Sequence, residues 1–576
     1  MRTTRALTAT LAIVALSSGG AVSATATDAE TGATSGTPST TIEWEPCGPG
    51  NECAIVQAPL DYSDPGAGTV DLHVARHRAN VESMGSLFVN PGGPGYGVED
   101  MVHGFSQFGP PQVNDRFDLV GIDPRGTGKS GFVDCNTNIE QDKAFQLTLD
   151  DGLADDVDSY IEDFAELAAT CEAEHGVEYL ASLTTENVAR DMEFVRQLLG
   201  DEPISYLGQS YGTAIGWVYA SLFPESVRSM ILDAAIVPDP TPNDLETGAL
   251  AFEQALQRLD TSCQLWDECP VADQGLLNAI DALQEQLAME GSIGPLQPYQ
   301  LDGAVRGLGA IPFLVRDLAP ALAMALDGDP AMLADIGGSF FTPLPGGSLI
   351  EFGASNPAIM CADGNPLVAR TADQLLDEAE RTLALAPNAG PSPGLPCDLW
   401  PVQGTGIPLP DYTGTAPIVV VGSRYDAITP YEWSVELADA LGPRATLLTW
   451  EGSDHTAAFT GADRCIDDYL LTLLIDGQAP APDTTCAQRG FVGLQWPDEG
   501  EAIVGGVTPG GSADQAGLEV GDIILEADGQ PVETGSDVPE GAIGSTLELK
   551  VQRGDEILDV VMERGAPVWE LWRESE

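Results

Sequence analysis

Three residue types that together cleave acyl bonds occur in a fixed order along this chain. Residues 208–212 read Gly-Gln-Ser-Tyr-Gly, with Ser210 at the centre, between an apolar run and an amphipathic run. Asp426 and His455 come later, and each follows another apolar run. A hydroxyl, an imidazole and a carboxylate acting in series supply a nucleophile, its general base and the acid that orients the base. We therefore expect nucleophilic catalysis at Ser210.

The two glycines around Ser210 indicate a sharp turn from a strand into a helix. Such a turn forces the serine into a strained backbone conformation and holds its hydroxyl clear of the sheet. The amides at the start of the following helix are free to bind a developing oxyanion. A five-residue pattern of this kind also occurs by chance, so an ordinary Gly-rich turn is the alternative interpretation of this stretch taken alone.

His455 is the only candidate for the general base. The chain has five histidines, and the other four precede Ser210 in sequence (His73, His77, His103 and His175). The order Ser, Asp, His is the order of the α/β-hydrolases. Asp426 is the predicted orienting acid. Asp454 is a weaker candidate because neighbouring side chains point apart. The alternative for His455 is a loop histidine with no role.

A second Gly-rich loop is predicted to complete the oxyanion site. Residues 85–90 read as a strand that runs into Pro-Gly-Gly-Pro-Gly at 91–95. A loop so rich in glycine brings backbone amides close to a ligand. We expect the amides of Gly93 and Tyr211 to be the oxyanion donors, the alternative for the loop being an ordinary turn.

The elements that position these residues follow from hydrophobic periodicity. Helical patterns cover 155–172 and 185–199, and a hairpin is expected within 55–78. Strands alternating with helices predict a mostly parallel sheet covered on both faces, with functional groups at the carboxyl ends of the strands. The region 238–345 contains helix-like runs and few strand candidates, which predicts a helical cap inserted into the fold. The expected strands are 85–90, 117–122, 204–209, 229–234, 417–422 and 445–450.

Charge and motif spacing argue against several other functions. The chain holds 24 basic and 89 acidic residues, a net charge of −65, which would repel nucleic acid and anionic lipid. Residues 123–130 nearly match a phosphate-binding loop, but Asp123 stands where the first glycine is required. The ten cysteines lack metal-finger spacing. We therefore expect no nucleotide, metal or other cofactor.

The first residues and the cysteines predict export. Residues 1–26 combine two arginines, a short apolar run and small residues before a cleavage position, which is typical of a signal peptide. Residues 27–41 are expected to be a flexible linker, and no apolar stretch is long enough for a membrane anchor. An even number of cysteines in an exported protein suggests disulfides. Sequence does not fix their connectivity, but near neighbours pair plausibly: Cys47 with Cys53, Cys135 with Cys171, Cys263 with Cys269, Cys361 with Cys397, and Cys465 with Cys486.

Residues 42–487 resemble the secreted tripeptidyl aminopeptidases, which are related to proline iminopeptidases among serine peptidases of the α/β-hydrolase fold. The motifs that carry this resemblance are the segments 90–95, 121–130, 208–212, 358–363, 426–430 and 455–459. The resemblance implies a triad of Ser210, Asp426 and His455. It also implies a product, a short peptide or a residue, released from a free N-terminus. Ala427 and Asp454 depart from the family pattern, which commonly has Pro and Gly there.

An aminopeptidase also requires an acid for the substrate ammonium, because an unpaired buried cation is costly. Asp363, Glu99 and Asp239 are the candidates. Two other functions remain open at this stage: an esterase or other acyl hydrolase on the same scaffold, because the same triad cleaves esters and amides, and a non-catalytic binding protein.

Residues 488–565 resemble the PDZ domains attached to bacterial exported proteases, and 566–576 form a tail. By this resemblance, the loop Phe491, Val492, Gly493 and Leu494 would capture the carboxylate of a peptide C-terminus. The helix that should wall the groove falls on 533–544, where helix formers are few and Pro539 intervenes. A peptide-binding role and a purely structural role are both open.

Overall fold

We analysed a computed structural model of the chain. The structure describes residues 33–34, 37–135, 153–200, 202–265, 269–310, 315–339, 354–364, 371–391, 394–461, 463–487, 494–495, 502–507, 512–532, 534–535, 538–539, 545–554 and 556–564. The predicted signal peptide and the tail at 566–576 lie outside the described residues.

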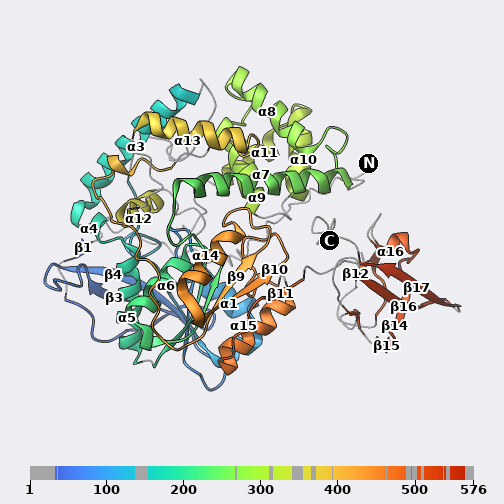
Figure 1. Ribbon diagram of the computed structural model, residues 1–576, viewed down its shortest axis with the longest axis horizontal. Helices are drawn as coiled ribbons and strands as arrows, with labels where there is room; N and C mark the ends of the chain where they lie inside the picture. The colour runs from blue at the N-terminus through green and yellow to red at the C-terminus, as the bar shows by residue number, and fades with distance from the viewer. Residues whose placement is uncertain are drawn as a thin grey trace.

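A mixed sheet of eleven strands forms the centre of the larger domain (Figure 1). Its strands lie in the order β11-β10-β9-β8-β7-β5-β6-β4-β3-β2, and β1 pairs with β4. The ladder is parallel from β11 to β6 and antiparallel from β6 to β2. The strands are β1 (Ala33–Thr34), β2 (Glu45–Gly48), β3 (Asn51–Pro59), β4 (Thr69–His77), β5 (Ser86–Asn90), β6 (Asp118–Ile122), β7 (Ile204–Gln209), β8 (Val227–Asp233), β9 (Ile418–Ser423), β10 (Ala445–Trp450) and β11 (Thr484–Cys486).

The predicted strands and hairpin are present. Strands β5 and β9 are buried along their whole length, as expected for parallel strands covered on both faces. The predicted hairpin within 55–78 is the antiparallel pair of β3 and β4. Within the segment 27–41, predicted to be a flexible linker, Ala33 and Thr34 pair with Val70 and Thr69, at the start of β4 where β6 does not pair with it.

Helices cover the sheet and build a separate layer on one side of it (Figure 1). Most of this layer comes from the long connection between β8 and β9, and we call helices α7 to α13 the cap. The helices of the chain before the cap are α1 (Glu99–Phe108), α2 (Pro111–Arg116), α3 (Leu153–His175), α4 (Val177–Ala181), α5 (Thr185–Leu199) and α6 (Gly212–Leu222). The cap consists of α7 (Pro242–Leu265), α8 (Leu276–Glu290), α9 (Pro298–Ala310), α10 (Val315–Leu326), α11 (Ala331–Ser339), α12 (Ser355–Asp363) and α13 (Ala372–Leu385), and α14 (Tyr431–Leu441) and α15 (Arg464–Asp476) follow it.

The cap has its own apolar core and reaches two other parts of the molecule. Leu256, Ile280 and Leu322 are among its fully buried side chains. Helix α3, from the connection after β6, packs against α13 of the cap. Ala427, the residue after Asp426, is buried in the core of the cap. The helical region therefore extends beyond the predicted end near 345 and packs against the loop that carries the predicted acid.

All five near-neighbour cysteine pairs are disulfides in the structure. Pairing of near neighbours is therefore confirmed. Among the described residues, no helix is both long and apolar enough to cross a membrane.

The C-terminal module forms separate sheets around a small apolar core (Figure 1). Strands β14, β16 and β17 are antiparallel neighbours, and β15 extends the sheet beside β14. Its elements are β12 (Leu494–Gln495), β13 (Gly506–Val507), α16 (Ser512–Gln515), β14 (Ile523–Ala527), β15 (Gln530–Pro531), β16 (Thr546–Arg553) and β17 (Glu556–Glu563).

Candidate active site

Ser210 lies on the sharp turn between β7 and α6, as predicted. Its φ is +54°, in the left-handed region that a residue with a side chain rarely adopts. The flanking glycines are required sterically. A Cβ atom on Gly208 would lie 2.3 Å from the carbonyl oxygen of Gly212, and one on Gly212 would lie 2.8 Å from that of Asn90. The turn therefore has the strained geometry of a nucleophile elbow.

His455 and Asp426 come together at the ends of adjacent strands. The imidazole Nδ1 of His455 lies 3.1 Å from both carboxylate oxygens of Asp426. Asp426 also accepts hydrogen bonds from the backbone N–H groups of Ile428 (2.8 Å) and Thr429 (3.0 Å) and from the Thr429 hydroxyl (2.9 Å). These bonds fix the carboxylate and leave it aimed at the imidazole. Thr429, which the sequence did not single out, completes this arrangement.

The environment of His455 favours its protonated form. Burial acts to lower its pKa, but the charge of Asp426 and the hydrogen bond to it outweigh burial, with a smaller contribution from Asp233. The net pKa of His455 is therefore raised above its ordinary value. Stabilisation of the imidazolium by a carboxylate is what a general base requires when it removes the proton of a serine.

Asp233 ties the turn at Ser210 to the loop that carries His455. Its backbone carbonyl accepts the N–H of Ser210 at 2.9 Å. Its carboxylate Oδ2 accepts the N–H groups of Ala457 at 3.0 Å and Ala458 at 2.9 Å, both close to His455. Burial raises the pKa of Asp233 to about 6, although these hydrogen bonds act to lower it. The sequence held a signal for this residue, since a carboxylate ends the buried strand β8.

The predicted oxyanion loop is packed directly against the serine turn. The N–H of Gly92 donates to Oδ1 of Asn90 at 2.9 Å, so it is used within the loop. A Cβ atom on Gly92 would lie 2.9 Å from the backbone nitrogen of Tyr211. Gly93, the next residue, lines a cavity together with Tyr211. The two residues predicted as oxyanion donors therefore border the same space.

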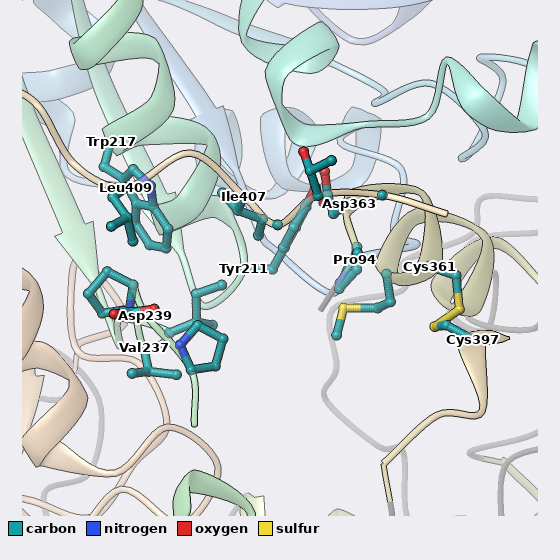
Figure 2. Close-up of a pocket in the computed structure, with 18 of the residues that line it drawn as sticks. Pro94, Tyr211, Trp217, Val237, Asp239, Cys361, Asp363, Cys397, Ile407 and Leu409 are labelled. Atoms are coloured by element: carbon teal, nitrogen blue, oxygen red, sulfur yellow. A yellow bond between two sulfur atoms is a disulfide. The ribbon is translucent and has the colours of Figure 1, made fainter. Parts of the chain in front are cut away.

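That cavity has a volume of about 640 Å³ and a mainly apolar wall with acidic groups (Figure 2). Trp217, Leu409 and Asp239 lie at one end, Pro94 and the Cys361–Cys397 disulfide at the other, and Tyr211 between them. Its other lining residues include Ile236, Val237, Met360, Asp398, Gln403, Ile407 and Trp433. No Lys, Arg or His is among the lining residues of this cavity in the described part of the chain. The cavity therefore suits an apolar ligand that carries a positive charge.

The acids predicted to bind the substrate ammonium differ in their positions. Asp239 and Asp363 line the cavity. Glu99 is not among the lining residues. It pairs with Lys129 and lies 3.3 Å from Nε2 of His73, so its charge is already balanced elsewhere. Asp363 is 5% exposed, and burial raises its pKa to about 7 while hydrogen bonds from Thr185 act to lower it.

Four residues that do not line this cavity carry atoms of the kind that bind metal ions. The ligand atoms of Cys47, Cys53, Glu99 and His103 lie within 4.8 Å of one another, as in a metal site. The two sulfur atoms are joined in a disulfide, so neither is available as a thiolate.

In the C-terminal module, Phe491, Val492 and Gly493 of the predicted carboxylate loop lie outside the described residues. Leu494 is buried in β12 and pairs with Val507. Residues 534–535 and 538–539, the described part of 533–544, contain no α-helix.

Comparison with known proteins identifies the family. Residues 85–273 match the model of the alpha/beta hydrolase fold, residues 388–486 match that of TAP-like proteins, and residues 503–553 match that of the PDZ domain.

Three curated relatives cover most of the chain. A protein of Mycobacterium tuberculosis named serine protease Hip1 is 32% identical over 77% of this chain and 91% of its own length. Carboxylesterase B of the same species is 31% identical over 76% of this chain and 86% of its own. The tripeptidyl aminopeptidase of Streptomyces lividans is 30% identical over 77% of this chain and 86% of its own. The chain therefore belongs to the family of TAP-like proteins with the α/β-hydrolase fold, and it is a serine hydrolase. It also carries a C-terminal PDZ domain.

Proposed function

We propose that this chain is an exported serine exopeptidase that removes short peptides or residues from the free N-terminus of peptides. The observation that carries the proposal is the connected geometry around Asp233, which joins the strained turn of Ser210 to the loop of His455. His455 in turn contacts Asp426. Export is supported by the predicted signal peptide at 1–26 and by five disulfides, which persist in oxidising compartments.

In the proposed reaction, Oγ of Ser210 attacks the carbonyl carbon of the scissile amide while its proton moves to Nε2 of His455. The amides of Gly93 and Tyr211 stabilise the resulting oxyanion, and Asp426 stabilises the imidazolium. The proton then passes to the leaving amine as the C–N bond breaks, which leaves an ester on Ser210. Water attacks this ester with His455 as the base, and the N-terminal fragment is released.

The acidic wall of the cavity supports recognition of a free N-terminus. An ammonium group removed from water needs a negative partner. Asp239 and Asp363 are the acids that we predicted and that line this cavity. Relatives named serine protease and tripeptidyl aminopeptidase support a peptide substrate.

Hydrolysis of esters is the second candidate function. It is favoured by the mainly apolar wall of the cavity and by the relative named carboxylesterase B.

We further propose that the PDZ domain binds a peptide C-terminus through the loop at 491–494. A titration of the full chain with peptides bearing free or amidated C-termini tests this.

The two activities are separated by substrate comparison in the full-length protein. Peptidyl amides with a free N-terminus, the same amides with an acetylated N-terminus and simple aryl esters are compared in the parent protein and in Ser210→Ala. A fluorophosphonate should label the parent and not the variant. We expect the free peptides to be preferred by at least about 100-fold over the acetylated ones, the discrimination expected when a buried acid loses its partner. Equal rates on free and acetylated peptides, with faster ester cleavage, would favour the esterase.

A further inference from the structure

A buried chain of hydrogen bonds connects the cap to the residue after the proposed nucleophile. Asp363 ends helix α12, Thr185 begins helix α5, and Tyr211 follows Ser210. Oδ1 of Asp363 accepts the N–H of Thr185 at 2.7 Å, and Oδ2 accepts the Thr185 hydroxyl at 2.6 Å. The Thr185 oxygen lies 2.6 Å from the hydroxyl of Tyr211. Since the Thr185 proton goes to Asp363, the Tyr211 hydroxyl is the donor in that last contact.

This chain is well protected from water. Thr185 is fully buried, and Asp363 and Tyr211 are also buried. Hydrogen bonds in such surroundings are stronger than in water, and a broken one leaves a polar group without compensation. The carboxylate also lies at the N-terminus of α5, where the helix dipole favours a negative charge. The arrangement is therefore rigid, and its direction is set by the Thr185 hydroxyl, which donates to Asp363.

Tyr211 is held at both ends by different parts of the molecule. Its backbone nitrogen lies against Gly92 in the predicted oxyanion loop, and its hydroxyl contacts Thr185. A tyrosine side chain has only two soft torsions, so fixing the hydroxyl restricts where the backbone can lie. The preceding residue, Ser210, is in a strained conformation that persists only when its surroundings over-determine it. The contact at Thr185 is one such constraint.

Asp363 is itself fixed by the wall of the cavity. Its carbonyl oxygen accepts the N–H of Gly406 at 2.6 Å. Gly364, the next residue, is packed so closely on Gly404 that a Cβ atom on it would lie 2.2 Å from the carbonyl carbon. Gly404 and Gly406 both line the cavity. Figure 2 shows Asp363 beside the ring of Tyr211 at this wall. The wall of this cavity and the serine turn are thus joined through one carboxylate.

We propose that Asp363 is a positioning residue that, through the hydroxyl of Thr185, fixes Tyr211 and thereby aligns its backbone amide with the oxyanion of the reaction. This inference rests on the proposed function, because it requires hydrolysis through Ser210. In this role Asp363 positions Tyr211 instead of binding the substrate ammonium, which leaves Asp239 as the other predicted acid that lines the cavity. The expected defect on removing the chain lies in kcat and not in KM.

The experiment uses the full-length protein with Thr185→Val, Thr185→Ser and Tyr211→Phe. Loss of the hydroxyl in Thr185→Val is expected to lower kcat by about 10- to 100-fold with KM changed less than about 3-fold, since an oxyanion donor is displaced but not removed. The affinity for a peptide aldehyde, which forms an oxyanion on the serine, should fall by the same factor. Thr185→Ser keeps the hydroxyl and should restore kcat. The double variant Thr185→Val/Tyr211→Phe should have a kcat no lower than that of the poorer single variant, because both substitutions remove the same interaction.

Asp363→Asn separates positioning from ammonium binding. Asparagine can accept the N–H of Thr185 and donate to its hydroxyl, so the chain survives with reversed polarity. A positioning role predicts that kcat falls modestly, and by the same factor, for peptides with free and with acetylated N-termini. A rise in KM confined to the free peptides would overturn the proposal, as would an unchanged kcat in Thr185→Val. If the parent protein is not labelled at Ser210, the proposed function fails as well. Labelling of the parent combined with an unchanged kcat in Thr185→Val removes only the present inference.

Discussion

Replacing Asp233 by asparagine should stabilise the protein near neutral pH, and the gain should disappear in acid. Burial raises the pKa of this carboxyl from 3.8 to about 6. A folded-state pKa above the unfolded value means that the folded protein binds the proton more tightly. The contribution of Asp233 to stability is therefore most favourable below pH 3.8 and is lost as the pH rises through 6.

The size of the effect follows from that shift. Two units of pKa correspond to about 3 kcal/mol, which is the cost of holding the ionised carboxylate in the folded state above pH 7. The asparagine side chain carries no charge and can keep an oxygen where Oδ2 of Asp233 accepts the N–H groups of Ala457 and Ala458. It gives up the longer contact of 3.3 Å from Ala457 to Oδ1. The net gain expected at pH 7.5 is therefore about 1 to 2 kcal/mol.

Urea unfolding of Asp233→Asn and the parent, at pH 7.5 and again at pH 4, measures this difference. Asp233→Ala serves as the comparison, because it also removes the ionisable group but leaves two buried N–H groups unpaired, so it should be less stable than Asp233→Asn by about 2 to 4 kcal/mol at either pH. The asparagine variant should also keep most of its activity, since the loop of His455 stays tied to the end of β8. A variant Asp233→Asn that is less stable than the parent at pH 7.5, or a difference that is the same at both pH values, would refute the reasoning.

Three other predictions concern the site and its support. Asp426→Asn should lower kcat on the order of 10⁴-fold and move the acid limb of the kcat/KM profile to lower pH, because the imidazolium loses its main stabilising charge. Gly92→Ala should abolish activity, since its Cβ would lie 2.4 Å from the carbonyl oxygen of Gln209 at a φ of +96°, and retained activity would show that the loop can move. Removing either the Cys361–Cys397 or the Cys135–Cys171 disulfide should cost about 4 kcal/mol in unfolding experiments, because both have a sequence separation of 36. Only the first lines the cavity, so only its loss should change KM, and equal effects on KM would contradict this assignment.

Sequence by itself determined the features that depend on local pattern. Apolar runs predicted the strands that precede Ser210, Asp426 and His455, and these strands are present. Glycines at 208 and 212 predicted the strained turn, because only a missing Cβ allows such close packing. Near-neighbour pairing of the cysteines, which the sequence favoured without fixing the connectivity, holds for all five disulfides.

Only the tertiary structure decided the roles that depend on what a side chain meets across the fold. Among many acids, sequence could not distinguish Glu99, which pairs with Lys129, from Asp363, which is buried against Thr185. Nor could it show that Asp233 joins two loops more than 200 positions apart in the chain. Acidic residues cannot be told apart in a sequence, because the pattern of polar and apolar residues indicates which side chains are exposed but not which groups they contact. Their function is set by burial and by the hydrogen bonds they accept, and both arise only when distant segments pack together.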